Sequence, residues 1–291
     1  MTRFKPGTVA LGIVSAAVFV YLFIPLITIA VFTFNEPTTK FNTTWEGFTF
    51  DNWAHPFSEK LFTDALIQSV RVAGVACVLA TILGSLIAMA LGRYRMRGSG
   101  AINLLLILPL TTPEIVMGAS LFTLFFNYGA ERGFTTIVIA HTLFCLSFVA
   151  MTVKARTRGM DWSLEDAAMD LGSPPLRTFW KITFPGVLPG VAGAFLLSLA
   201  LSIDDYIITS FVAGPTVTFP RKVFDSARIA LPAQVHVLAT IIMLVAIVII
   251  VASTLTGNRR QKARMSPDPR SAWMVGVAAM VRTTPAATRR A

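Results

Sequence analysis

The sequence predicts an all-α polytopic membrane protein with six transmembrane helices, and three observations carry that prediction. Hydrophobic residues make up 54% of the 291 residues and charged residues only 14%, too few charges to cover a soluble protein. Uncharged stretches of about 20 residues recur, and a helix of that length crosses a hydrocarbon core of about 30 Å. Lysine and arginine are concentrated in alternate connecting segments. This composition excludes a soluble enzyme.

The candidate spans are six apolar stretches separated by polar or basic segments. They run roughly Val9 to Phe34, Val72 to Leu91, Ala101 to Phe126, Phe134 to Val153, Val187 to Val212 and Val235 to Leu255. The first stretch is too long for a cleaved signal peptide, so we expect it to persist as a span. The expected organisation is a short N-terminus (1–8), a membrane domain (9–257) and a basic tail (258–291).

The positive charges predict the orientation. One alternate set of segments carries 18 Lys and Arg residues and the other carries 6. Because basic residues favour the cytoplasmic side, we expect both termini in the cytoplasm and an external loop over residues 35–69. The tail from residue 258 is expected to be disordered, with residues 272–281 too short to span the membrane.

The longest cytoplasmic segment has the local chemistry of two short helices joined by a tight turn. Ser163 followed by Asp166 fits a capping box, and Gly172 can adopt the left-handed conformation that ends a helix. Ser173 with Pro174 fits the start of a second helix, which we expect to stop at Pro185. A polar helical hairpin of this kind, over 161–185, is expected to be either a docking surface or a solvated connector.

The same segment resembles the EAA loop of ABC importer permeases, which docks on a nucleotide-binding subunit. The pattern is Asp-Ala-Ala, three residues, glycine, nine residues, then Ile-Thr-Phe-Pro. It departs from the family in having Asp166 in place of glutamate and Phe184 in place of leucine. The resemblance implies an ATPase-coupling set that comprises Glu165, Asp166, Ala167, Ala168, Gly172, Ile182 and Pro185.

Further segments narrow the resemblance to spermidine/putrescine permeases of the PotC type. They are YLFIPL, GRYRMRG, PEIVMG, LSIDDYIITSFVAGP and FPRKVFDSAR, spread from Tyr21 to about Gly257. The chain has no GxxxxGK[ST] motif, so ATP hydrolysis would belong to another subunit. The resemblance implies a bacterial inner-membrane protein without a cofactor. The implied partners are an ATPase dimer, a second, PotB-like permease and an extracytoplasmic polyamine-binding protein, with no nucleic acid.

Charged residues inside spans are functional candidates because their insertion is costly. Glu114 lies in the third span, and Asp204 and Asp205 lie in the fifth. Asp205 shares one helical face with polar residues, namely Ser198, Ser202 and Thr209, whereas Asp204 is rotated by about 100° among apolar neighbours. This periodicity predicts that Asp205 faces an aqueous pathway and that Asp204 pairs with a partner helix. The alternative is that these acids only satisfy backbone or neighbouring donors at a helix interface.

Anionic oxygens and aromatic faces can stabilise a partly dehydrated ammonium group. The resemblance implies that a set of five residues lies along the polyamine route: Trp53, Glu114, Ser202, Asp204 and Asp205. Taken alone, Trp53 is equally an interfacial aromatic belt residue. His141 and the two cysteines, Cys77 and Cys145, are expected to be packing residues, with no metal site. Two alternatives to the importer are an ion- or proton-coupled secondary carrier that uses the buried acids, and a purely structural membrane subunit.

Overall fold

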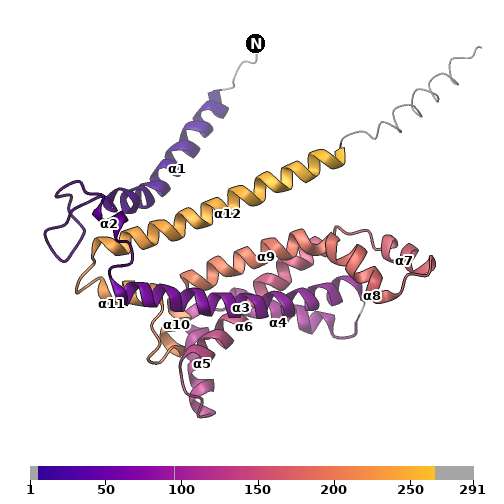
Figure 1. Cartoon of the computed structure of the whole chain (residues 1–291). Helices are drawn as coiled ribbons and strands as arrows, with labels where there is room; N and C mark the ends of the chain where they lie inside the picture. Colours follow the sequence, from indigo (N-terminus) through magenta and orange to yellow (C-terminus); the bar gives the residue numbers. More distant parts are fainter. Residues whose placement is uncertain (1–5, 95, 266–291) are drawn as a thin grey trace, which may run out of the picture. The chain divides into compact units, whose positions relative to one another are not determined.

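The computed structural model describes residues 6–94 and 96–265. These residues form helices joined by short loops, and the described ranges contain no β-strand beyond two isolated bridges. The elements in Figure 1 are α1 (Pro6–Phe32), α2 (Asp51–Ala54), α3 (Lys60–Arg93), α4 (Ser99–Thr111), α5 (Glu114–Asn127), α6 (Phe134–Thr157), α7 (Ser163–Asp170), α8 (Pro175–Thr178), a π-helical turn (Phe179–Thr183), α9 (Phe184–Asp204), α10 (Ile207–Val212), α11 (Phe219–Ser226) and α12 (Ala233–Met265).

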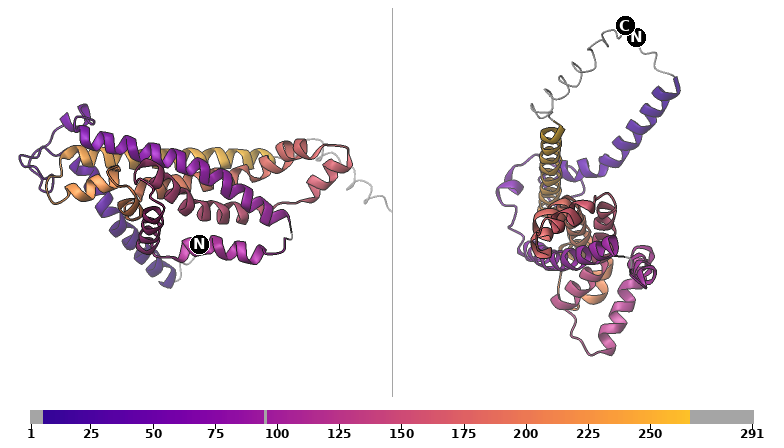
Figure 2. Two further views of the ribbon diagram at one scale, coloured as in Figure 1. Left: turned by 90° about the horizontal axis from the view of Figure 1, so that it is seen from below. Right: turned by 90° about the vertical axis from the view of Figure 1, so that its right-hand side faces the viewer.

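The core is a bundle of α3, α6 and α9, which pack against one another. Small residues allow the close approach that membrane helices need, since lipid supplies little hydrophobic drive for their association. A Cβ atom added to Gly84 of α3 would lie only 2.9 Å from Val149 Cγ1 of α6. The α7–α8 hairpin lies at one end of this bundle, and α10 with α11 lies at the other (Figures 1 and 2).

Membrane-spanning helices confirm the predicted class. Four helices of the described chain are long and apolar enough to span a bilayer: Ala10–Phe32, Lys60–Arg93, Phe134–Thr157 and Pro175–Asp204. Taken together as one bent span, α4 and α5 are also long and apolar enough to cross a bilayer. Residues Ala233–Ile249 of α12 form a shorter apolar helix. The count of six spans therefore stays a prediction.

Two of the predicted spans are broken, which the sequence analysis did not anticipate. The axis bends by 109° between α4 and α5, where Pro113 lacks an amide hydrogen and restricts Thr112 to an extended conformation. A second break separates α9 from α10 at Asp205, whose backbone is also extended. The candidate spans over residues 101–126 and 187–212 therefore each contain two helices.

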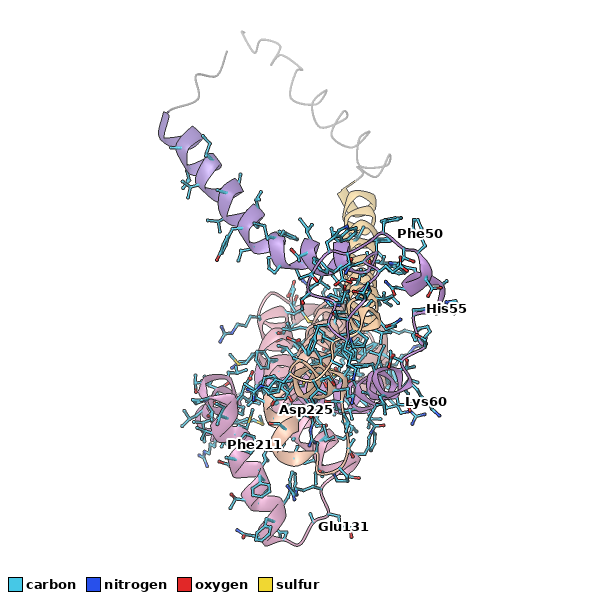
Figure 3. All side chains as sticks on the ribbon, turned by 90° about the vertical axis from the view of Figure 1, so that its left-hand side faces the viewer. Phe50, His55, Lys60, Glu131, Phe211 and Asp225 are labelled. Atoms are coloured by element: carbon cyan, nitrogen blue, oxygen red, sulfur yellow. The ribbon has the colours of Figure 1, made fainter. Side chains whose placement is uncertain are left out.

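The loop predicted to be external is shorter than the predicted range 35–69, because α3 begins at Lys60. Buried asparagines organise it: Asn35 Nδ2 donates to Asn42 Oδ1 at 2.6 Å, and Asn52 Nδ2 donates to the Asn35 carbonyl at 2.8 Å. Figure 3 follows the loop through Phe50 and His55 to Lys60.

The chain divides into two compact units, residues 1–239 and 240–291. In the second unit α12 continues as a helix to Met265, into the segment predicted to be a disordered tail. The remaining tail and the short run at 272–281 lie outside the described residues.

Candidate transport pathway and coupling site

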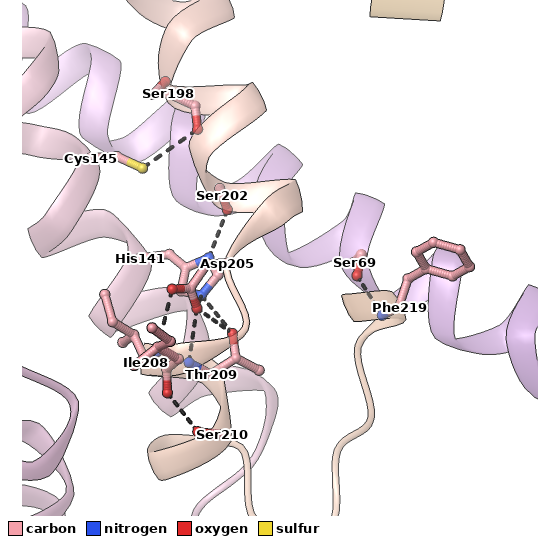
Figure 4. A network of polar contacts seen from close by, with 11 residues as sticks. Ser69, His141, Cys145, Ser198, Ser202, Asp205, Ile208, Thr209, Ser210 and Phe219 are labelled. Atoms are coloured by element: carbon pink, nitrogen blue, oxygen red, sulfur yellow. Dashed lines mark hydrogen bonds and ion pairs between the residues drawn. The ribbon is translucent and has the colours of Figure 1, made fainter. Parts of the chain in front are cut away.

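A buried polar network joins α6 to the α9–α10 break (Figure 4). His141 Nδ1 lies 2.7 Å from Ser202 Oγ, and its Nε2 lies 3.1 Å from Asp205 Oδ2 and 2.9 Å from Thr209 Oγ1. The His141 and Asp205 side chains are 2% and 3% exposed. Since buried polar groups are costly unless paired, this network satisfies several of them at once.

Asp205 also closes the start of α10. Its carboxylate accepts three hydrogen bonds: from the Thr209 amide at 2.9 Å, from the Thr209 hydroxyl at 2.8 Å and from the Ile208 amide at 3.3 Å. The first amides of a helix have no partner within that helix, and inside a membrane no water replaces one. The carboxylate of Asp205 therefore serves the fold by capping a helix within an apolar segment.

The structure buries Asp205 and exposes Asp204, so the alternative of an acid that satisfies neighbouring donors holds for Asp205. Ser198, Ser202, Asp205 and Thr209 do share one face, as the periodicity indicated, but all four are buried against the core. Asp204, the last residue of α9, is exposed. The reason is that α6 supplies His141 to the polar face, so that face turns inward and Asp204 turns outward.

Glu114 and Asp204 have similar structural positions. Glu114 is the exposed first residue of α5, directly after one helix break, and Asp204 directly precedes the other. The two broken segments are neighbours, because α5 packs against α10. The contact is close: a Cβ on Gly118 would lie 2.6 Å from the Phe211 ring. Two carboxylates thus lie at the breaks of adjacent discontinuous helices, an arrangement that transporters use around substrate sites.

Trp53 lies elsewhere, in α2, within the loop between α1 and α3. Its indole Nε1 donates to Thr33 Oγ1 at 3.0 Å, and its ring stacks on Phe34 at 6.0 Å between centroids. Within residues 6–94 and 96–265, no hydrogen bond or ring contact joins Trp53 to Glu114, Ser202, Asp204 or Asp205. The structure therefore brings Ser202 and Asp205 together through His141 and leaves Trp53 in a separate cluster.

The predicted hairpin over residues 161–185 forms, although its caps differ in detail. Asp161, in place of a Ser163–Asp166 capping box, accepts the Ser163 amide at 3.0 Å and its hydroxyl at 2.7 Å. These two bonds lower the pKa of the Asp161 carboxyl.

The turn of this hairpin is built on Gly172, which has φ +84°, as predicted. The Gly172 amide donates to the Met169 carbonyl and the Ser173 amide to the Ala168 carbonyl, which together make a Schellman motif. The second helix starts one residue later than predicted, at Pro175.

Pro185 does not stop the second helix, contrary to the prediction. It lies in the first turn of α9, where a missing amide hydrogen costs little, and the π-helical turn joins α8 to α9 without a break. Ile182 is half-buried in that turn. The hairpin is thus continuous with the helix that ends at Asp204, so the predicted docking region and the α9–α10 break lie on one element.

Large apolar side chains on the hairpin are exposed. Leu171 at the turn is 90% exposed, and the flanking Leu164, Leu176 and Trp180 are exposed by more than half. The α7 helix has no buried residue. Exposed apolar side chains clustered on a polar segment indicate a surface for another protein.

Two residues, one in the buried polar network and one beside the hairpin, were not identified as functional from the sequence. His141 was expected only to pack, and it does so through hydrogen bonds. Arg93 was counted only as a cytoplasmic charge, yet it contacts Glu165 and Asp166. Cys77 and Cys145 are buried and free, as expected, and no cluster of metal ligands occurs within residues 6–94 and 96–265.

Comparison with known proteins decides the family. Residues 80–265 match the model of the binding-protein-dependent transport system inner membrane component. The chain belongs to this family of ABC importer permeases. It is 36% identical to the spermidine/putrescine transport system permease protein PotC of Escherichia coli K12 over 88% of this chain and 97% of that protein. It is also 37% identical to the putrescine transport system permease protein PotI of the same organism, over 77% of this chain and 82% of that protein.

Solved structures agree on the fold. A bacterial ABC transporter that imports the acidic polysaccharide alginate has a chain with a TM-score of 0.65, at 16% identity, over 87% of this chain and 99% of that one. A bacterial alginate ABC transporter in complex with an alginate-bound periplasmic protein has a chain with a TM-score of 0.60, at 14% identity, over 87% of this chain and 95% of that one. The permease is therefore a multi-pass membrane subunit of an ABC importer, and the secondary-carrier alternative gains no support.

Proposed function

We propose that this ABC importer permease passes polyamines such as spermidine and putrescine through the bacterial inner membrane, with Glu114 and Asp204 along the route. The observation that carries the proposal is the exposure of these two carboxylates at adjacent helix breaks. An ammonium group that loses water on entering a membrane is stabilised by anionic oxygens. The exposed carboxylates of Glu114 and Asp204 can both contact such a group. The names of the relatives at 36–37% identity supply the substrate class.

Asp205 and Ser202 contribute indirectly in this proposal. Their side chains are occupied by His141 and by the start of α10, so they hold the break at which Asp204 is presented. Trp53 contributes from the external loop, where its stacked indole supports the fold of the segment that faces an arriving ligand.

The exposed hairpin is proposed as the docking site for a cytoplasmic ATPase subunit dimer, which hydrolyses the ATP. Glu165, Asp166, Gly172 and the exposed Leu171 are its contact residues, while Ala167, Ala168, Ile182 and Pro185 shape it. A second, PotB-like permease and an extracytoplasmic polyamine-binding protein complete the importer. Both termini are cytoplasmic in this arrangement, with six spans over residues 9–257 and the tail 258–291 outside the membrane.

Reconstitution tests this proposal. The chain is assembled in proteoliposomes with its ATPase, second permease and binding protein, and the import of labelled spermidine and putrescine is measured with and without ATP. ATP-dependent import of either amine, abolished by Gly172→Pro while the subunit stays inserted, is the expected result. An assembled complex that hydrolyses ATP but imports neither amine would overturn the polyamine assignment.

A further inference from the structure

One arginine side chain of the helical core contacts the start of α7 in the coupling hairpin. Arg93, the last residue of α3, places its Nε 3.2 Å from Glu165 Oε2 and its Nη2 2.5 Å from Asp166 Oδ1. Its guanidinium carbon also lies 5.5 Å from the centre of the Trp162 ring. Three residues at the start of the hairpin, Trp162, Glu165 and Asp166, thus contact one guanidinium group, which can pair with carboxylates and stack on an aromatic face.

The base of this contact is rigid. Gly92, the preceding residue, packs so closely against α6 that an added Cβ would lie 2.6 Å from Thr157 Oγ1. Thr157 is fully buried, and its hydroxyl donates to the Lys154 carbonyl at 2.9 Å. Arg93 therefore extends from a fixed point of the α3–α6 interface.

The far side of the contact has little else to hold it. No residue of α7 is buried, and this helix packs mainly on α8 and the π-helical turn of its own hairpin. Since apolar burial supplies most of the stability of a short helix, α7 depends on its few polar contacts for its place against α3.

We propose that Arg93 is a positioning residue that fixes α7 relative to the membrane helices, so that movement of the ATPase is passed to the pathway and not lost in the hairpin. This inference rests on the proposed docking of the hairpin. The hairpin would then be connected to the membrane helices in two ways: through Arg93 to α3, and through the continuous helix from α8 into α9.

The ratio of amine imported to ATP hydrolysed tests the role of Arg93. The full complex in proteoliposomes carries Arg93→Gln, Arg93→Lys or the control Arg97→Gln. Arg97 lies in the loop that follows α3, has the same charge, is exposed, and forms no ion pair with residues 6–94 or 96–265. We expect Arg93→Gln to lower the ratio about fivefold, the upper range for an exposed ion pair, with the ATPase still bound. Arg93→Lys keeps the charge but loses the planar fork, so an intermediate ratio is expected.

A second measurement reports the position of the helix directly. A spin label at Leu164, which is 59% exposed on α7, should become more mobile in Arg93→Gln and remain unchanged in Arg97→Gln. An unchanged ratio and an unchanged label in Arg93→Gln would overturn the inference, as would equal losses in the Arg97→Gln control. Failure of the wild-type complex to import any amine, with normal ATP hydrolysis, would instead count against the polyamine assignment.

Discussion

Replacing His141 by leucine should destabilise the permease strongly without touching any exposed surface. The substitution removes both ring nitrogens, so Ser202 loses its partner and Asp205 loses one of its donors. Leaving a buried polar group without its hydrogen-bond partner costs about 1–3 kcal/mol, and more when the group is charged. Because both Ser202 and Asp205 lose His141 while Asp205 keeps the Thr209 and Ile208 donors, we expect a total loss of about 3 kcal/mol.

Thermal unfolding in detergent measures this loss. At roughly 2–4 °C per kcal/mol, the Tm should fall by about 6–12 °C. The matched control is His55→Leu, whose imidazole is 66% exposed, and a loss within about 0.5 kcal/mol is expected there. Adding Asp205→Asn to His141→Leu should cost less than the sum of the two single losses, because the unpaired charge is then gone. Equal Tm values for His141→Leu and His55→Leu, or strict additivity, would refute the reasoning.

Two further predictions concern packing and topology. Gly84→Val should lower the free energy of unfolding by about 1–3 kcal/mol, because the new side chain would overlap Val149 and the Leu146 carbonyl. The yield of purified protein and its Tm measure this loss. A normal Tm would show that α3 and α6 can separate freely. A cysteine at exposed Thr39 should react with an impermeant thiol reagent in intact cells, whereas one at exposed Arg158 should not, and the opposite pattern would invert the proposed orientation.

Periodicity and composition predicted the apolar segments well, because a membrane imposes the same length and charge limits on every span. The turn of the helical hairpin was also predictable, since Gly172 acts through local backbone geometry, whereas the prolines did not give the bounds of the second helix. The α4–α5 bend was not identified, although Pro113 stands at it. A proline within an apolar run is compatible with both a kinked and a broken helix.

The direction of the polar face in α9 could not be obtained from its own sequence. The spacing of Ser202, Asp205 and Thr209 fixes only that they share a face, and whether that face meets water or protein depends on another helix. Here α6 supplies His141, more than 60 residues earlier in the chain. Arg93 is a similar case, because its partners Glu165 and Asp166 approach it only in the folded chain.

The central claim is that Asp204, and not Asp205, faces the polyamine route. Initial rates of labelled polyamine import, divided by the amount of assembled complex, test it most directly. Asp204→Asn should lower the rate per complex about five- to 150-fold, as expected for losing about 1–3 kcal/mol at a charged contact. Asp205→Asn should mainly reduce the amount and the Tm of the complex. A normal rate per complex for Asp204→Asn, together with a large loss for a stable, fully assembled Asp205→Asn, would contradict the claim.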